Sequence, residues 1–205
     1  MGLYDTYVLP HLIGIACGSD DVAEQRRKVV PLATGRVLEV GMGPALNLPF
    51  YNPAKVELVW GLEPSESMRR KAAPALEASD LDVRWLGLRG EDIPLDDNSV
   101  DTVVLTYTLC TIADWEAALA QMRRVLRPGG RLLFSEHGEA PDASVRVWQH
   151  RIDPIWTRLA GGCHITRPIP RMIESAGFDL VELESAYRPG PKIASFHSWG
   201  VARPG

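Results

Sequence analysis

The stretch Val37-Leu38-Glu39-Val40-Gly41-Met42-Gly43-Pro44-Ala45 decides the fold. Its apolar, β-branched first half predicts a buried strand, and two glycines at G-x-G spacing follow that strand directly. Such a turn lets the backbone approach a ligand closely. The next predicted strand ends at Gly61-Leu62-Glu63-Pro64, so Glu63 lies about 20 residues further on, where a carboxylate accepts hydrogen bonds from both ribose hydroxyls. These two features together predict a nucleoside site.

Apolar, β-branched runs alternate with helical patterns along the chain, which is typical of a sheet with helices on both faces. We expect strands at 36–40, 56–62, 81–86, 100–106, 131–136, 180–185 and 193–202. The short, proline-containing link between the last two strands favours an antiparallel hairpin over a parallel crossover. The predicted fold class is therefore α/β: a doubly wound, Rossmann-like seven-stranded sheet, mostly parallel, with a C-terminal antiparallel hairpin and helices on both faces.

Three residues mark helix boundaries between these strands. Ser65 and Asp114 are of the residue types that cap helix N-termini, and each precedes a helical pattern. Pro74 lies inside the first of the two helices and should kink or split it. The second helix is expected to stop at Arg127-Pro128-Gly129-Gly130.

Composition limits the class of protein. The chain has 205 residues, of which 45% are hydrophobic and 23% charged, so it predicts one globular domain over 1–205 and excludes a disordered chain. A net charge of −4 speaks against sequence-independent binding to nucleic acid, because neutralising phosphates needs a positive surface. The three cysteines, Cys17, Cys110 and Cys163, lie far apart in sequence and form no C-x-x-C pair, which predicts reduced thiols and no metal site.

The first 34 residues are expected to form a helical lid over the site, because 1–34 precedes the sheet and carries many apolar side chains. Their most apolar stretch, 7–17, is interrupted by Pro10 and His11 and falls short of the ~20 residues that a spanning helix needs. It also lacks the basic start of a signal peptide. We therefore expect a cytoplasmic protein without an integral membrane segment, and leave peripheral membrane contact and the oligomeric state open.

The residue at position 46 narrows the choice of nucleoside. A dinucleotide fingerprint, G-x-G-x-x-G, needs a third glycine there, and this chain has Leu46. Glu39, two residues before Gly41, adds a carboxylate that repels a diphosphate and suits an ammonium group. S-adenosylmethionine carries an amine and a sulfonium and has no phosphate, so it fits both observations. The alternative for Glu39, a strand-end residue satisfied by local backbone, stays open.

Four short motifs lie in order between positions 38 and 130. They read Leu38-Glu39-Val40-Gly41-Met42-Gly43, Gly90-Glu91-Asp92-Ile93-Pro94, Asp97-Asn98-Ser99-Val100-Asp101 and Arg127-Pro128-Gly129-Gly130. Together they resemble the class I S-adenosylmethionine-dependent methyltransferases. This resemblance implies an enzyme with S-adenosylmethionine as cofactor and S-adenosylhomocysteine as product. Ala45 stands where the family usually has a third glycine, which tightens the loop without removing the cofactor.

The resemblance also implies which residues hold the cofactor. Gly41 and Gly43 would face its methionyl part, and Glu63 would hold the ribose. Residues 90–92 would border the adenine, and Thr106 would lie near the transferable methyl. The alternative for Thr106 is a plain strand residue, and for the aspartate of 90–92 a helix cap or turn. The full implied set is Glu39, Gly41, Met42, Gly43, Asn47, Glu63, Pro64, Met68, Gly90, Glu91, Asp92 and Thr106.

A closer likeness covers nearly everything from about residue 35 onward. The segments that carry it are Tyr107-Thr108-Leu109-Cys110, Ser135-Glu136-His137, Trp148-Gln149, Asp153-Pro154-x-Trp156 and Gly162-Cys163-His164-Ile165-Thr166-Arg167. They resemble the small thiol methyltransferases of the methyltransferase-like group, which implies a small-molecule acceptor, foremost a thiol. The alternatives are a lipid amine, a quinone or phenol as acceptor, or a non-catalytic S-adenosylmethionine-binding module. A nicotinamide oxidoreductase is disfavoured by Leu46 and by the terminal hairpin.

The segment 137–167 is expected to form an insert beside the acceptor. Its candidate catalytic residues are His137 and Asp153, with His150 as a further helper, because a thiol of pKa ~8.5 needs only modest help to lose its proton. Each has an alternative. Asp153 before Pro154 is also typical of a helix N-cap, His137 of a residue that bonds a loop carbonyl, and His150 of a solvated helix.

Two further patterns in this region have competing interpretations. Apolar residues repeat at helical spacing and predict either core packing or a wall of the acceptor pocket. Cys110 and Cys163 are interpreted as small buried packing residues rather than nucleophiles. The helical repeat consists of Trp148, Ile152, Ile155, Trp156 and Leu159.

Overall fold

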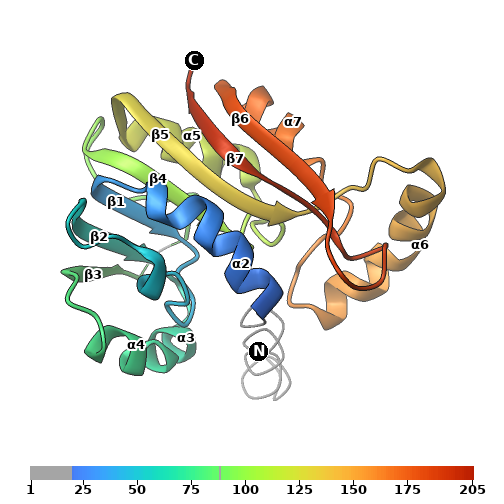
Figure 1. Ribbon diagram of the computed structural model, residues 1–205. Coiled ribbons are helices and arrows are strands. Elements are labelled where there is room, and N and C mark those ends of the chain that lie inside the picture. Colours follow the sequence, from blue (N-terminus) through green and yellow to red (C-terminus); the bar gives the residue numbers. More distant parts are fainter. Residues whose placement is uncertain (1–19, 88) are drawn as a thin grey trace.

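A computed structural model describes residues 20–87 and 89–205 and contains one seven-stranded sheet (Figure 1). The strands are β1 (Gly35–Val40), β2 (Val56–Leu62), β3 (Val83–Leu86), β4 (Val100–Thr106), β5 (Leu126–His137), β6 (Phe178–Tyr187) and β7 (Phe196–Pro204). Their order across the sheet is β3-β2-β1-β4-β5-β7-β6. The pairs among β1 to β5 are parallel, whereas β7 runs antiparallel to both β5 and β6. The predicted fold class is confirmed.

The carboxyl ends of four parallel strands meet at one edge of the sheet. Val40 at the end of β1 pairs with Leu62 of β2 on one side and with Leu105 of β4 on the other. Thr106, which ends β4, pairs with Ser135 of β5. Whatever follows these strands in sequence therefore gathers at this edge, which is where open α/β sheets bind ligands.

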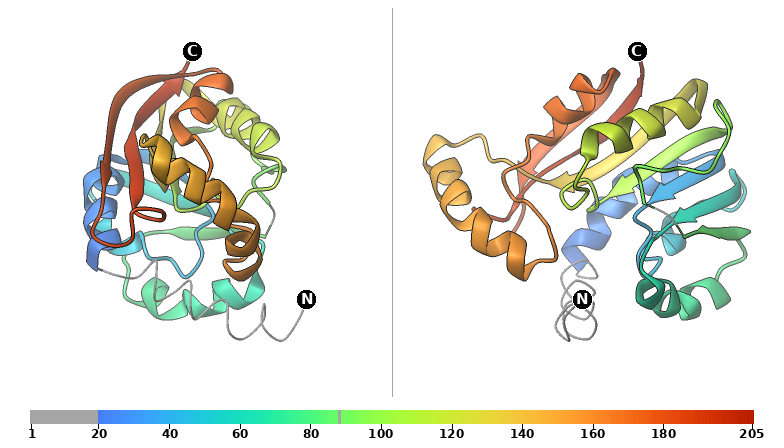
Figure 2. Two further views of the ribbon diagram at one scale, coloured as in Figure 1. Left: turned by 90° about the vertical axis from the view of Figure 1, so that its right-hand side faces the viewer. Right: turned by 180° about the vertical axis from the view of Figure 1, so that it is seen from behind.

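Helices cover both faces of the sheet, as Figure 2 shows for α5 and α7 on one face and α2 on the other. Alternate residues of each strand face opposite sides, so Leu38 belongs to the core under α5 and α7, and Val37 to the core under α2. A longer helix, α6, stands beyond the carboxyl end of β5, away from the sheet (Figure 1). The helices are α2 (Asp20–Val29), α3 (Glu66–Lys71), α4 (Ala73–Glu77), α5 (Trp115–Val125), α6 (Ala143–Leu159) and α7 (Ile169–Ser175), with 3-10 turns η2 (Val30–Leu32) and η3 (Leu48–Phe50).

The predicted helix boundaries at Ser65, Asp114 and Pro74 are confirmed. The Ser65 hydroxyl accepts from the backbone N–H of Met68 at 3.4 Å, and Asp114 Oδ1 accepts from the N–H of Ala117 at 3.0 Å. Pro74 lies where α3 and α4 separate.

The second helix ends at Val125, just before Arg127-Pro128-Gly129-Gly130, so its predicted stop is confirmed. The fifth strand begins earlier than predicted, at Leu126 rather than at position 131, directly after α5. The last strand starts later than predicted, at Phe196, since residues 191–194 form a turn in which the N–H of Ala194 donates to the carbonyl of Pro191. The third strand likewise starts at Val83 rather than at position 81.

The predicted lid divides into two parts. Residues 1–19 lie outside the described residues. Residues 20–34 pack on the sheet, where Val29, Val30 and Ala33 are fully enclosed in the core. This second part is therefore a fixed portion of the domain rather than a lid. Over 20–87 and 89–205, no helix is long and apolar enough to cross a membrane.

Candidate functional site

The loop after β1 takes the tight form that its glycines predict. Gly41 and Gly43 have φ of 70° and 54°, the left-handed region that glycine enters without penalty. A Cβ on Gly41 would lie 2.3 Å from the Thr108 side chain, whereas a Cβ on Gly43 would meet nothing closer than 3.9 Å. Ala45 also has a positive φ, 62°, so the departure from glycine keeps the turn at a backbone cost of roughly 1–2 kcal/mol.

Glu63 lies directly after β2 and is bonded to this loop. Its Oε2 accepts from the backbone N–H of Gly43 at 3.0 Å, and its Oε1 accepts from the N–H of Ser65 at 2.8 Å. Burial raises the pKa of Glu63, and these two backbone hydrogen bonds oppose the rise. A carboxylate has about four lone-pair sites, so each oxygen can still accept a ribose hydroxyl.

Glu39, Asn47 and Thr106, all predicted cofactor residues, form one buried hydrogen-bond network. Glu39 is 2% exposed and accepts from Tyr51 Oη at 2.7 Å and from Asn47 Nδ2 at 3.0 Å. Asn47 Nδ2 also lies 3.0 Å from Thr106 Oγ1, and Asn47 Oδ1 accepts from Arg26 Nε at 2.9 Å. The alternative that local backbone satisfies Glu39 is wrong, because its partners are side chains.

Burial raises the pKa of Glu39 to about 7, although the hydrogen bonds from Tyr51 and Asn47 and the charge of Arg26 oppose the rise. Arg26 and Tyr51 also belong to this network and were not predicted from the sequence. Arg26 lies in a short basic run on α2, and no local signal distinguishes it from its solvated neighbours.

The remaining predicted cofactor residues differ in whether their side chains are buried or accessible. The Met42 side chain lies in the core against Gly61, so only its backbone can border the cofactor. Gly90 is buried, with room for a Cβ only at 3.4 Å from Val40 and Ala118. Asp92 is exposed and its N–H donates to the carbonyl of Arg89, which fits the turn alternative. Three residues keep partly or fully accessible side chains in this region: Pro64, Met68 and Glu91.

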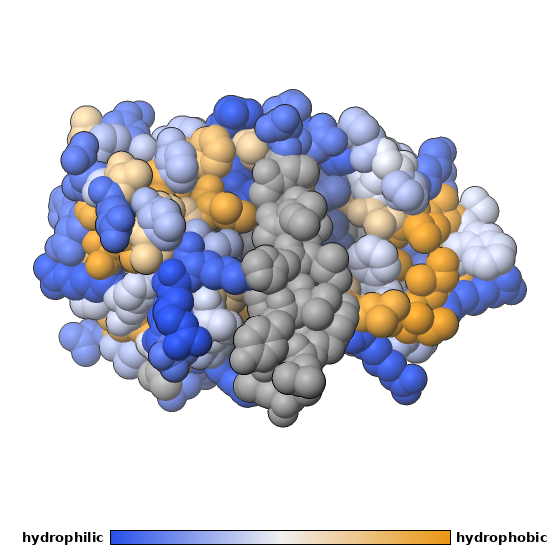
Figure 3. Space-filling view, turned by 90° about the horizontal axis from the view of Figure 1, so that it is seen from below, coloured by the Kyte–Doolittle hydropathy of each residue, from blue (hydrophilic) through white to orange (hydrophobic). Residues whose placement is uncertain are grey.

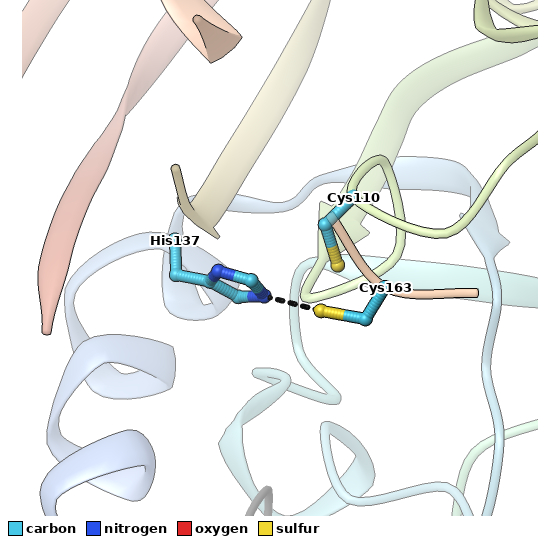
Figure 4. A group of neighbouring side chains, drawn as sticks. All are labelled: Cys110, His137 and Cys163. Carbon is cyan, nitrogen blue, oxygen red and sulfur yellow. Dashed lines mark hydrogen bonds between the residues drawn. The ribbon is translucent and has the colours of Figure 1, made fainter. Parts of the chain in front are cut away.

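On the acceptor side, His137 ends β5 and faces two cysteines (Figure 4). Its Nε2 lies 3.1 Å from Cys163 Sγ, so its partner is a thiol rather than a loop carbonyl. Cys163 Sγ also accepts from Trp156 Nε1 at 3.5 Å. Cys163 is half-buried, so the expectation that it is a buried residue is wrong. Cys110 is buried, as predicted.

Hydrogen bonds among Cys110, His137 and Cys163 shift the pKa values of Cys163 and His137. The Cys110 and His137 side chains hold the pKa of Cys163 well below its usual range, against the opposing effect of burial. Burial lowers the pKa of His137, but the Cys163 thiolate and the Glu136 carboxylate outweigh it and raise that pKa above its ordinary value. The pair therefore favours a thiolate beside an imidazolium.

Asp153 lies inside α6, which begins ten residues earlier at Ala143, so the helix-cap alternative is wrong. Its Oδ1 accepts from the backbone N–H of Ile165 at 2.9 Å, and its Oδ2 lies 2.8 Å from His164 Nδ1. Asp153 thus fixes the segment that follows α6, and a role as base stays a prediction. His150 is exposed, with Nε2 3.7 Å from Glu139 Oε1, which fits the solvated alternative.

The apolar repeat on α6 is not core. Trp148, Ile155 and Leu159 are 54%, 63% and 60% exposed, so the prediction of core packing is wrong for these three. Figure 3 shows orange, hydrophobic surface at the right-hand end of the molecule, the end that α6 forms in Figure 1. Ile152 and Trp156 are half-buried.

Sequence analysis also missed Glu136 as a member of the site. It is completely buried at the end of β5, and its Oε1 accepts from the N–H groups of Thr108 and Leu109 at 2.7 and 3.0 Å. Its Oε2 has no hydrogen-bond partner among the described residues. Burial raises its pKa to about 7, against the lowering effect of the backbone N–H donors. The sequence carried a signal for Glu136, because this carboxylate follows closely after the apolar run 132–134.

Comparison with known proteins gives the same class of protein as the fold and the site. A family profile described as a methyltransferase domain matches residues 38–134. Thiol S-methyltransferase TMT1A of Homo sapiens is 33% identical over 82% of this chain and 67% of its own length. Thiol S-methyltransferase TMT1B of Rattus norvegicus is 36% identical over 76% of this chain and 64% of its own length. The chain belongs to the S-adenosylmethionine-dependent methyltransferase family.

The chain spans about two thirds of the length of these two thiol S-methyltransferases, at 67% and 64%. Among solved structures, a putative methyltransferase from Bacillus halodurans superposes with a TM-score of 0.70, covering 91% of this chain and 100% of that one. Its 16% sequence identity makes this a likeness of fold alone.

Proposed function

We propose that this chain transfers the methyl group of S-adenosylmethionine to a small thiol, producing a methyl thioether and S-adenosylhomocysteine. The observation that carries the cofactor is the bond between the Gly43 N–H and Glu63, with the buried Glu39 network beside it. Two carboxylates next to a glycine turn suit an amine and a ribose and repel a diphosphate. The likeness to the thiol S-methyltransferases supports the acceptor class.

Methyl transfer from S-adenosylmethionine needs few catalytic groups from the protein. Methyl transfer from a sulfonium is an in-line displacement in which the cofactor supplies the leaving group, so the protein aligns the nucleophile and excludes water. The acceptor must arrive as a thiolate, and a reference pKa of ~8.5 leaves only a modest barrier to deprotonation. His137 and Asp153 are the proposed catalytic residues on the acceptor side, with Asp153 acting at least through the position of the segment after α6.

A second acceptor class has one observation in its favour. The exposed apolar side chains of α6, Trp148, Ile155 and Leu159, could contact a quinone, a phenol or the tail of a lipid amine. A phenol has a reference pKa near ~10 and needs more help to ionise than a thiol does. Turnover on matched acceptors separates these classes.

Two measurements test the proposal. Calorimetric titration with S-adenosylmethionine, S-adenosylhomocysteine and NAD should show micromolar-range binding of the first two and negligible binding of NAD. Turnover on a panel of thiols, phenols, quinols and amines should then show methylated thiol foremost. Cofactor binding without turnover on any acceptor would identify a non-catalytic binding module instead.

Of the predicted lid over 1–34, the part that is still proposed to close over the site is residues 1–19, before α2. The start of α2 supports this: Asp21 and Val22 line a cavity together with Tyr107 and His197, at the carboxyl edge of the sheet. Deleting residues 1–19 should leave the fold intact and abolish turnover, and unchanged turnover would remove the lid. No disulfide joins Cys110 or Cys163 to another described residue, which supports a reducing compartment such as the cytoplasm.

A further inference from the structure

Three potential metal-ligand atoms, two sulfurs and one imidazole nitrogen, converge at the carboxyl edge of the sheet beside the proposed acceptor site. The Sγ atoms of Cys110 and Cys163 and one ring nitrogen of His137 all lie within 4.8 Å of one another. They come from the loop after β4, the end of β5 and the loop after α6, so 53 residues separate the outermost two. Figure 4 shows the three side chains pointing toward a common centre.

Their spacing is close to what a tetrahedral metal site needs. With Zn–S bonds of ~2.3 Å and Zn–N bonds of ~2.0 Å, tetrahedral ligand atoms stand roughly 3.5–3.8 Å apart. The present 3.1 Å between His137 Nε2 and Cys163 Sγ is a hydrogen bond, whose proton would be displaced when a metal binds both atoms. Movements of a few tenths of an ångström to about one ångström close the site.

We propose that Cys110, His137 and Cys163 bind a zinc ion with one coordination position left open. Two thiolates and one imidazole are the ligands that zinc prefers, and three protein ligands are typical of catalytic rather than structural sites. The ion would replace the shared proton and be neutralised by the two thiolates.

The surroundings hold these ligands in place. The carbonyl of Cys110 accepts from the N–H of His164 at 2.9 Å, which ties the two cysteine loops together. Glu136 holds the backbone just before Cys110, and Asp153 holds Ile165, two residues after Cys163. Such a fixed backbone positions metal ligands before the ion arrives.

An outer contact and an access route complete the site. Trp156 Nε1 points its hydrogen at Cys163 Sγ, 3.5 Å away, an outer-shell contact of the kind that tunes a ligating sulfur. Cys163 and His137 are both half-buried, so a fourth ligand can reach the ion from solvent.

The open coordination position would let the zinc ion activate the acceptor thiol, a role that rests on the proposed function. An acceptor thiol would bind there and release its proton to water, because zinc binds the thiolate. The thiolate sulfur would then attack the methyl carbon of S-adenosylmethionine, forming a C–S bond as the methyl–sulfonium bond breaks. The electron pair of that broken bond stays on the sulfur of S-adenosylhomocysteine. The neutral thioether product is a weaker ligand and leaves.

Metal content tests the site independently of activity. The full-length protein, purified without chelator and titrated with zinc, should retain about one zinc per chain after gel filtration, measured by mass spectrometry of the metal. Cobalt in place of zinc should give a thiolate-to-cobalt charge-transfer band and visible bands typical of tetrahedral coordination. Cys163→Ser and His137→Ala should each lower zinc affinity at least ~10-fold, whereas His150→Ala, an exposed histidine on α6, should not.

Circular dichroism measures whether each variant is folded. The cobalt spectrum of the parent protein keeps the proposal testable even if Cys163→Ser does not fold. No retained zinc and no cobalt band in the folded parent would overturn the site. Retained zinc that Cys163→Ser and His137→Ala leave unchanged would overturn the ligand assignment.

Turnover separates the site from the proposed function. Removing zinc with a chelator should abolish thiol methylation and leave calorimetric binding of S-adenosylmethionine unchanged, and added zinc should restore the rate. Unchanged turnover in the zinc-free protein would overturn the role of the ion in activating the thiol. A parent protein that binds zinc and methylates no thiol would refute the proposed acceptor while the metal site stands.

Discussion

The backbone N–H of Gly43 donates to Oε2 of Glu63 at 3.0 Å, so the turn after β1 and the carboxylate after β2 hold each other in place. The two residues are twenty positions apart, and the parallel pairing of β1 with β2 brings them together. The carboxylate that is proposed to bind the ribose therefore also orders the glycine turn that is proposed to hold the rest of the cofactor.

Glu63→Ala should weaken binding of S-adenosylmethionine by roughly 1–3 kcal/mol, about 5- to 150-fold in Kd, because two hydroxyls lose their acceptor. Glu63→Gln keeps one carbonyl acceptor and should show an intermediate loss. Calorimetric titration measures both. An unchanged Kd in Glu63→Ala would show that the ribose assignment is wrong.

The two glycines of the turn should respond differently to alanine. Gly41→Ala adds a Cβ 2.3 Å from Thr108 at a positive φ, so overpacking and backbone strain together should cost ~2–5 kcal/mol of the free energy of unfolding. Gly43→Ala meets nothing closer than 3.9 Å and should cost only the strain, ~1–2 kcal/mol.

Urea denaturation of the cofactor-free protein compares the two variants. Equal losses of stability would mean that Thr108 moves aside freely. Gly43→Ala should nevertheless bind S-adenosylmethionine poorly, since its methyl group points into the open side of the turn.

Glu136 should make the protein less stable as pH rises. Its pKa is raised from 4.5 to about 7 in the folded state, so between these values the folded chain keeps a proton that the unfolded chain has lost. Glu136 should therefore contribute a fall of up to ~3 kcal/mol in the free energy of unfolding between pH ~4.5 and ~7, which levels off above pH ~7.

Glu136→Gln keeps an acceptor for Thr108 and Leu109 and cannot ionise, so the fall should become shallower in this variant. The buried Glu39, also with a pKa of about 7, should keep the remainder of the fall. Denaturation at several pH values measures both curves, with Glu116→Gln, an exposed carboxylate on α5, as control. Parallel curves for the parent and Glu136→Gln would contradict the assignment.

Asp153→Ala should lower the free energy of unfolding by ~1–3 kcal/mol, because the N–H of the buried Ile165 loses its acceptor. Asp153→Asn keeps an oxygen for that N–H and should retain most of the stability. If Asp153 also acts as a base, Asp153→Asn should lose rate most strongly below the pKa of the acceptor thiol and recover as pH rises. A pH–rate profile together with a denaturation curve distinguishes positioning from proton transfer.

The strand and turn pattern could be predicted because it depends on neighbours in sequence. Alternating apolar residues, the G-x-G turn, the caps at Ser65 and Asp114 and the break at Pro74 each act over a few residues. The proline-containing link predicts the terminal hairpin for the same reason. The wrong boundary at Leu126 shows the limit, because pairing with Val100 extends β5 through a Pro-Gly-Gly stretch that favours a turn locally.

By itself, the sequence determined the α/β sheet, the glycine turn and the presence of Glu63 at the end of the second strand. Only the tertiary structure decided that Arg26 and Tyr51 complete the network around Glu39, and that Cys110 and Cys163 face His137. The reason is physical: such contacts depend on which strands are neighbours in the sheet and on where the loop after α6 packs. No local propensity carries that information, because packing of distant elements sets it.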